Sequence, residues 1–77
     1  MLPAIEALEL EDREIFWQVL TTALEQMTHM QRICLLMSII GFDQSSTGRI
    51  LGVGQDVVSR HFTKALAKVK GISVEYL

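Results

Sequence analysis

Apolar side chains recur along most of the chain at intervals of three and four residues, which is the spacing of one face of an α-helix. Between about residues 12 and 27 this face is formed by Phe16, Leu20, Ala23, Leu24 and Met27. No stretch of four or more residues alternates apolar and polar side chains, as a half-buried strand requires. The pattern predicts an all-α protein whose first helix spans residues 12–27.

A second helix is predicted over residues 28–41. Thr28 followed by Gln31 is the sequence pattern of a capping box, in which each side chain accepts a hydrogen bond from the other residue's backbone N–H. Gly41 is expected to end the helix in a left-handed conformation. Within the apolar run between these signals, Ile33, Leu36, Met37 and Ile40 are expected to line one face of the helix.

Two further helices complete the predicted small four-helix domain. Asp43 is expected to cap a short helix over residues 44–51, which ends at Gly52. A longer helix is expected from about residue 55 to residue 70, ended by Gly71. The spacing of its apolar residues predicts a buried face of Val58, Phe62, Ala65, Leu66 and Val69.

The residues Gly52-Val53-Gly54 separate the last two predicted helices. This is the length and composition of the turn in a helix-turn-helix, so residues 44–70 are predicted to form that motif at the C-terminal end of the domain. Gly48 lies where the two helices are expected to approach most closely. This packing reason offsets the roughly 1 kcal/mol that glycine costs inside a helix.

The sequence over about residues 27–71 resembles region four of bacterial sigma factors. The resemblance is carried by Gln31-Arg32, Leu35-Leu36, Gly41, Ile50-Leu51-Gly52-Val53, Val58 and Lys64-Ala65-Leu66 with Lys68. The helix-turn-helix of LuxR-type regulators fits nearly as well through Val58 and His61. The reading head of the Trp repressor is a weaker match, through Leu51-Gly52-Val53-Gly54 and Val58-Ser59-Arg60.

Two departures from these families stand in the first helix of the motif. Ser46-Thr47-Gly48 occupies positions where Glu-Ile-Ala is frequent, and Arg49 falls where an acidic residue is common. The chain also lacks the upstream region that opens promoter DNA in a whole sigma factor. The resemblance therefore implies a helix-turn-helix and leaves the subfamily open.

A helix-turn-helix places its second helix in the major groove of double-stranded DNA, where exposed side chains meet base edges. The resemblance assigns base reading to Gln55, Asp56, Ser59 and Arg60, and the outward position of Thr63 adds that residue. Asp56 is expected either to accept from a cytosine amino group or to orient Arg60. The expected phosphate contacts are Arg32, Arg49, Lys64 and Lys68.

Charge is unevenly distributed along the 77 residues, which are expected to form a single domain over residues 1–77. Residues 1–27 hold one basic and six acidic residues, whereas residues 28–77 hold six basic and three acidic ones, and the net charge of the chain is −2. An acidic front and a basic back favour a polyanion at one end of the molecule. An ordinary solvated surface with uneven charge is the alternative.

The first predicted helix is apolar on more than one stripe, and the mean hydropathy of +0.31 is high for a small monomer. These features predict a homodimer or partner interface on this helix. The residues assigned to it are Ile15, Phe16, Trp17, Val19 and Leu20. The alternative is that Trp17 and its neighbours cover the core of a monomer.

No arrangement of residues supports catalysis, so the chain is not expected to be an enzyme. A single cysteine, Cys34, excludes an internal disulfide and a multi-cysteine zinc site, and it is interpreted as a core residue. His61 is interpreted as a packed residue rather than a metal ligand, and no cofactor is expected. No apolar run reaches the roughly 18 residues of a membrane span. We therefore expect a cytoplasmic, nucleoid-associated protein with no membrane partner.

Two functions remain open from the sequence. The first is a DNA-binding transcriptional regulator that places residues 55–70 in the major groove as a homodimer. The second is an adaptor similar to sigma region four that binds RNA polymerase or another protein, with little DNA contact of its own. Salt dependence separates them, because phosphate contacts weaken steeply with salt.

Overall fold

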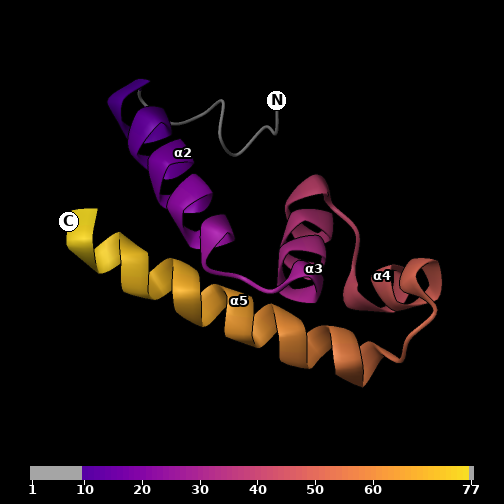
Figure 1. The fold of residues 1–77 in the computed structure, drawn as a ribbon. Coiled ribbons are helices and arrows are strands. Elements are labelled where there is room, and N and C mark those ends of the chain that lie inside the picture. The colour runs from indigo at the N-terminus through magenta and orange to yellow at the C-terminus, as the bar shows by residue number, and fades with distance from the viewer. Residues whose placement is uncertain (1–9, 77) are drawn as a thin grey trace.

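The computed structural model describes residues 10–76, so residues 1–9 and 77 of the predicted domain lie outside the described part. Within it the chain forms helices and no strand, which confirms the all-α prediction (Figure 1). The four helices are α2 (Leu10–Glu25), α3 (His29–Ile40), α4 (Gln44–Leu51) and α5 (Gln55–Tyr76).

The longest helix, α5, runs along one side of the molecule and contacts each of the other three helices (Figure 1). The core lies where α2 and α3 meet the middle and end of α5. Its buried apolar residues are Val19, Leu20, Ala23, Met27, Leu35, Ala65 and Ile72. The predicted apolar stripe of the first helix is confirmed, because its remaining members, Phe16 and Leu24, pack half-buried against this core.

Hydrogen bonds at both ends of α3 confirm its predicted caps. The Gln31 backbone N donates to Thr28 Oγ1 at 3.3 Å, and the Thr28 backbone N donates to Gln31 Oε1 at 3.2 Å. At the other end, Gly41 has a φ of 121°, and its N–H donates to the carbonyls of Met37 and Ser38. The chain therefore leaves α3 in a conformation that favours glycine.

The short helix α4 has the bounds predicted for it. Asp43 caps it, because its Oδ1 accepts a hydrogen bond of 2.7 Å from the Ser46 backbone N. Gly52 ends it in the left-handed region, with a φ of 73°. The charge-stabilising bond from Ser46 also holds the pKa of the Asp43 carboxyl below its usual value.

The prediction that Gly71 ends the last helix is wrong, since α5 continues through Gly71 to Tyr76. Ile72, one residue further on, is only 5% exposed and belongs to the core. Burying an isoleucine side chain stabilises the fold by roughly 1.5–3 kcal/mol, whereas glycine inside a helix costs about 1 kcal/mol. Packing against the rest of the core therefore outweighs the local stop signal.

The apolar face predicted for α3 is not the face that the fold buries most deeply. The residues that α3 buries are Gln31, Cys34 and Leu35, whereas Leu36 is 38% exposed and Ile40 is 62% exposed. Nearly every position from 33 to 40 is apolar, so the spacing alone does not select a face. The position of α5 selects it, because α5 covers the side that carries Gln31 and Leu35.

Candidate nucleic-acid interface

The joint between α4 and α5 is held by a close backbone contact at Gly48. The Val53 N–H donates to the Gly48 carbonyl at 2.9 Å, and a Cβ at Gly48 would lie 2.8 Å from the Val53 carbonyl oxygen. Gly48 is therefore required by the backbone of the turn, rather than by the approach of two helix axes as the sequence analysis expected. Thr47 beside it is 1% exposed, and its Oγ1 donates to the Asp43 carbonyl at 2.9 Å.

The five residues assigned to base reading lie within the first nine residues of α5, which the joint with α4 positions. Their spacing of one and four residues places them on one face of the helix. Four of these side chains are exposed and Ser59 is half-buried; the set is Gln55, Asp56, Ser59, Arg60 and Thr63. The structure therefore brings these residues together at one end of the molecule.

Arg60 is exposed and forms no hydrogen bond or ion pair within the described residues. The Asp56 carboxylate turns toward the start of α5, since a Cβ built on Gly54 would lie 2.5 Å from its Oδ1. No contact between Asp56 and Arg60 occurs in the described part of the chain. The Arg60 guanidinium is therefore not held by a hydrogen bond or ion pair within the described part of α5.

The four residues assigned to phosphate contact differ in what they already bind. Lys64 is exposed, with no partner among residues 10–76. Arg49 is exposed and its Nη2 donates to Ser46 Oγ at 3.0 Å. Arg32 is exposed as well, but its Nε donates to the Leu24 carbonyl at 2.7 Å, near the end of α2.

Lys68 is bound inside the fold. Its Nζ donates to the Gln26 carbonyl at 2.7 Å and to Gln31 Oε1 at 2.7 Å. The carbonyl of Gln26 lies just after α2, where the helix dipole favours a cation, and Gln31 belongs to the cap of α3. Lys68 therefore joins three helices, and the sequence analysis missed this structural role because the partners lie 42 and 37 residues away.

The five residues assigned to a dimer or partner interface are divided by the fold. Val19 and Leu20 are 7% and 6% exposed and form part of the core of one chain, and Phe16 packs against them. Ile15 and Trp17 are exposed. The Phe16 and Trp17 rings meet edge to face, with centroids 5.1 Å apart. Of the five, Ile15 and Trp17 are therefore the two that are exposed in the single chain, at 38% and 41%.

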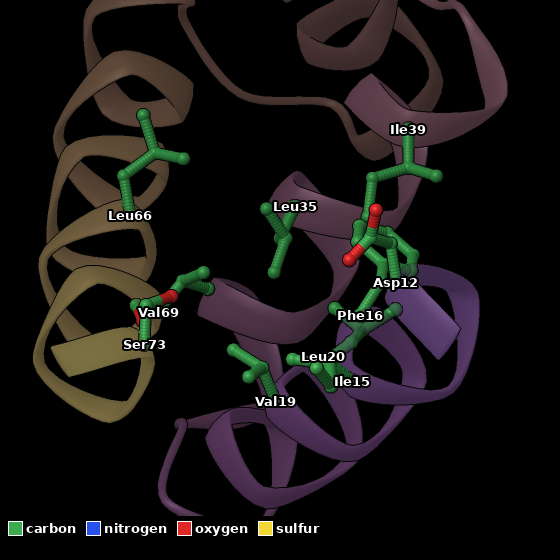
Figure 2. Close-up of a pocket in the computed structure, with 10 residues that line it drawn as sticks. All are labelled: Asp12, Ile15, Phe16, Val19, Leu20, Leu35, Ile39, Leu66, Val69 and Ser73. Atoms are coloured by element: carbon green, nitrogen blue, oxygen red, sulfur yellow. Dashed lines mark hydrogen bonds between the residues drawn. The ribbon is translucent and has the colours of Figure 1, made fainter. Parts of the chain in front are cut away.

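An apolar groove that the sequence analysis did not foresee opens between α2, α3 and α5 (Figure 2). Its volume is about 380 Å³. The lining residues are Asp12, Ile15, Phe16, Val19, Leu20, Leu35, Ile39, Leu66, Val69 and Ser73. The Ser73 hydroxyl already donates to the Val69 carbonyl at 2.9 Å. The groove was missed because the helix was expected to end before Ser73; the spacing of Leu66, Val69 and Ser73 was the available signal.

Two buried polar groups complete the description of the interior. Cys34 is 2% exposed, and burial raises the pKa of its thiol. His61 is half-buried, and its Nδ1 has no hydrogen-bond partner within the described residues. Among residues 10–76, no cluster of three or more His, Cys, Asp or Glu side chains is placed to hold a metal ion.

No helix within the described residues is both long enough and apolar enough to cross a bilayer. Comparisons of the chain with protein-family models, with curated proteins and with solved structures give no match.

Proposed function

We propose that this chain is a DNA-binding transcriptional regulator in which α4 and α5 form a helix-turn-helix. The observation that carries the proposal is the polar, exposed face over Gln55–Thr63, held at a defined angle by the backbone contact at Gly48. These side chains have no hydrogen-bond partners in the described part of the chain. They are therefore available to base edges.

The dimensions and chemistry of this face suit the major groove. Nine helical residues rise about 12 Å, comparable with the width of that groove. Arg60 has the donors for a bidentate contact with guanine, and Gln55 has the donor and acceptor for adenine. Asp56 accepts from a cytosine amino group in this arrangement, because it does not orient Arg60.

Phosphate contacts fall to the cations that remain exposed. The exposed face over Gln55–Thr63 is called the reading face below. Lys64 lies one residue beyond it, and Arg49 lies on α4. Arg32 keeps part of its guanidinium available, since only its Nε donates to a carbonyl within the chain. Lys68 contributes mainly by holding α5 against α2 and α3, so its role in binding is indirect.

A single helix contacts few bases, so we propose that the regulator binds as a homodimer on a site with two half-sites. Selection from random duplex DNA, with the mass of the complex measured, tests both statements. The expected result is an inverted repeat bound by two chains. A folded protein that enriches no sequence would contradict the proposal.

The role of Arg60 is tested on the selected duplex. Arg60→Ala is expected to cost roughly 1–3 kcal/mol of binding free energy and to relax the base preference at one position. Arg60→Lys is the matched control: it keeps the charge and the salt dependence but loses the bidentate geometry. Unchanged affinity and specificity in both variants, with normal circular dichroism, would rule out α5 as the reading helix.

The second candidate is an adaptor similar to sigma region four that binds RNA polymerase or another protein. It is favoured by the apolar residues left exposed at the end of α3 and just beyond it: Leu36, Ile40 and Phe42 are 38%, 62% and 42% exposed. Binding to purified RNA polymerase that is lost in Ile40→Ser and insensitive to salt would support the adaptor. Absence of polymerase binding, together with sequence-selective DNA binding that is lost in Arg60→Ala, would support the regulator.

A further inference from the structure

The groove between α2, α3 and α5 lies at the opposite end of α5 from the reading face. Part of its apolar lining is exposed to water in the single chain, since Ile15 is 38% exposed (Figure 2). Covering this lining with a partner would remove apolar surface from water, which favours association.

The two long edges of the groove carry opposite charge. On α2, Asp12 lines the groove and Glu11 lies one turn before Ile15; both are exposed. On α5, the exposed Lys70 lies one turn after Leu66, which lines the groove. None of these three charged groups has a partner among residues 10–76. The groove therefore has an acidic edge and a basic edge, each unpaired within one chain.

We infer that the occupant of this groove is a second copy of the same chain, packed groove to groove about a twofold axis. A twofold axis that runs along the groove places α2 of one copy against α5 of the other. Glu11 and Asp12 of each chain then face Lys70 of the other. The apolar residues of both grooves become buried in the interface, out of contact with water. The opposite charges of the two edges make the surface complementary to itself.

The direction of the axis also places the two exposed faces over Gln55–Thr63, and this step rests on the proposed function. Because the axis runs along the groove, the two α5 helices run parallel and both faces lie at the same end of the dimer. Two such faces at one end of a dimer can contact a single DNA duplex together.

Sedimentation equilibrium without DNA tests the interface. The wild-type chain is expected to form a dimer whose population rises with concentration. Ile15→Glu should weaken dimerisation about tenfold or more, because it places a carboxylate in the apolar contact. Thr21→Glu, which adds the same charge on another face of α2, is the matched control and should leave the constant unchanged.

Charge reversal gives the sharper test. Lys70→Glu should weaken the dimer, and combining it with Glu11→Lys and Asp12→Lys should restore it, because the two edges then exchange charge. A chain that stays folded and monomeric at every concentration would overturn the inference, and so would a dimer that neither Ile15→Glu nor Lys70→Glu weakens. A dimer of the expected behaviour that selects no DNA sequence would contradict the proposed function but not the proposed interface.

Discussion

The two halves of α5 differ in what their side chains contact. In the first half, Gln55, Asp56 and Arg60 point into solvent, and the helix is held through the backbone of the turn that precedes it. In the second half, Lys68 and Ile72 are bound by α2, α3 and the core. One rigid element thus carries a polar surface at one end and the attachments of the domain at the other.

The pair Lys64 and Lys68 shows that the residue type alone does not determine the role of a side chain. Both lysines lie on α5 one turn apart, and both are predicted from the sequence to contact DNA phosphate. Lys64 is exposed and unpaired within the described residues, whereas the ammonium of Lys68 donates to two oxygens at 2.7 Å. Substitutions in the two halves are therefore expected to have separable effects, on binding in one half and on folding in the other.

The largest expected effect is at the joint that supports the first half. Gly48→Val should lower the free energy of unfolding by about 3 kcal/mol, near the upper end of typical overpacking costs, because the new Cβ meets a backbone carbonyl that is not free to move aside. Urea unfolding measures the loss. A variant as stable as the wild type would show that the turn backbone adapts and that the joint is not fixed by this contact.

In the second half, Lys68→Met should lower the free energy of unfolding by roughly 1–2 kcal/mol. Methionine keeps the apolar stem, but the Gln26 carbonyl loses the Lys68 donor and the buried Gln31 Oε1 keeps only the longer hydrogen bond from the Thr28 backbone N. The matched control is Lys64→Met, which should change stability by less than about 0.5 kcal/mol and instead reduce the salt slope of DNA binding by about one. Equal loss of stability in both variants would remove the contrast between the two lysines.

Gly71→Ala should stabilise the protein by roughly 0.5–1 kcal/mol. The residue sits inside α5, its φ is not positive, and a Cβ there would have no atom within 4 Å. The melting temperature should rise accordingly. A decrease would indicate that the space beside Gly71 is filled in solution, which would contradict its position on an open face of α5.

The smallest effect is a pH dependence at the cap of α4. Because the pKa of Asp43 is lowered in the folded state, its carboxylate adds stability above the usual aspartate pKa of about 3.9. That contribution is lost as the pH falls through the lowered value. Asp43→Asn keeps a capping acceptor without the charge, so its unfolding should vary less with pH over this window. Identical pH profiles for the two proteins would contradict the assignment.

The elements that the sequence predicted well depend on neighbours in the chain. Thr28 with Gln31, Asp43 with Ser46, and the left-handed glycines Gly41 and Gly52 all act within four residues, so the bounds of α3 and α4 followed from local chemistry. The exposed face over Gln55–Thr63 followed from the spacing of its buried neighbours. Its role in DNA binding stays a prediction.

What the sequence did not predict depends on contacts between distant residues. Gly71 carries the same stop signal as Gly41, but the burial of Ile72 overrides it. Gln31 is buried because Lys68 supplies a donor from another helix, which no local pattern shows. The groove could not be predicted for the same reason. It requires the extension of α5 beyond Gly71, and it depends on which face of α3 is covered by α5.

The lone thiol of the chain lies on that buried face of α3. Cys34 is 2% exposed, and because burial raises its pKa, it carries little thiolate in the folded protein. A thiol-specific reagent therefore reacts with it at an appreciable rate only during excursions that separate α3 from its neighbours. Since the chain contains no other cysteine, the rate at which the unaltered protein is modified reports how often those openings occur. If dimerisation suppresses those openings, the modification rate should fall as the protein concentration rises.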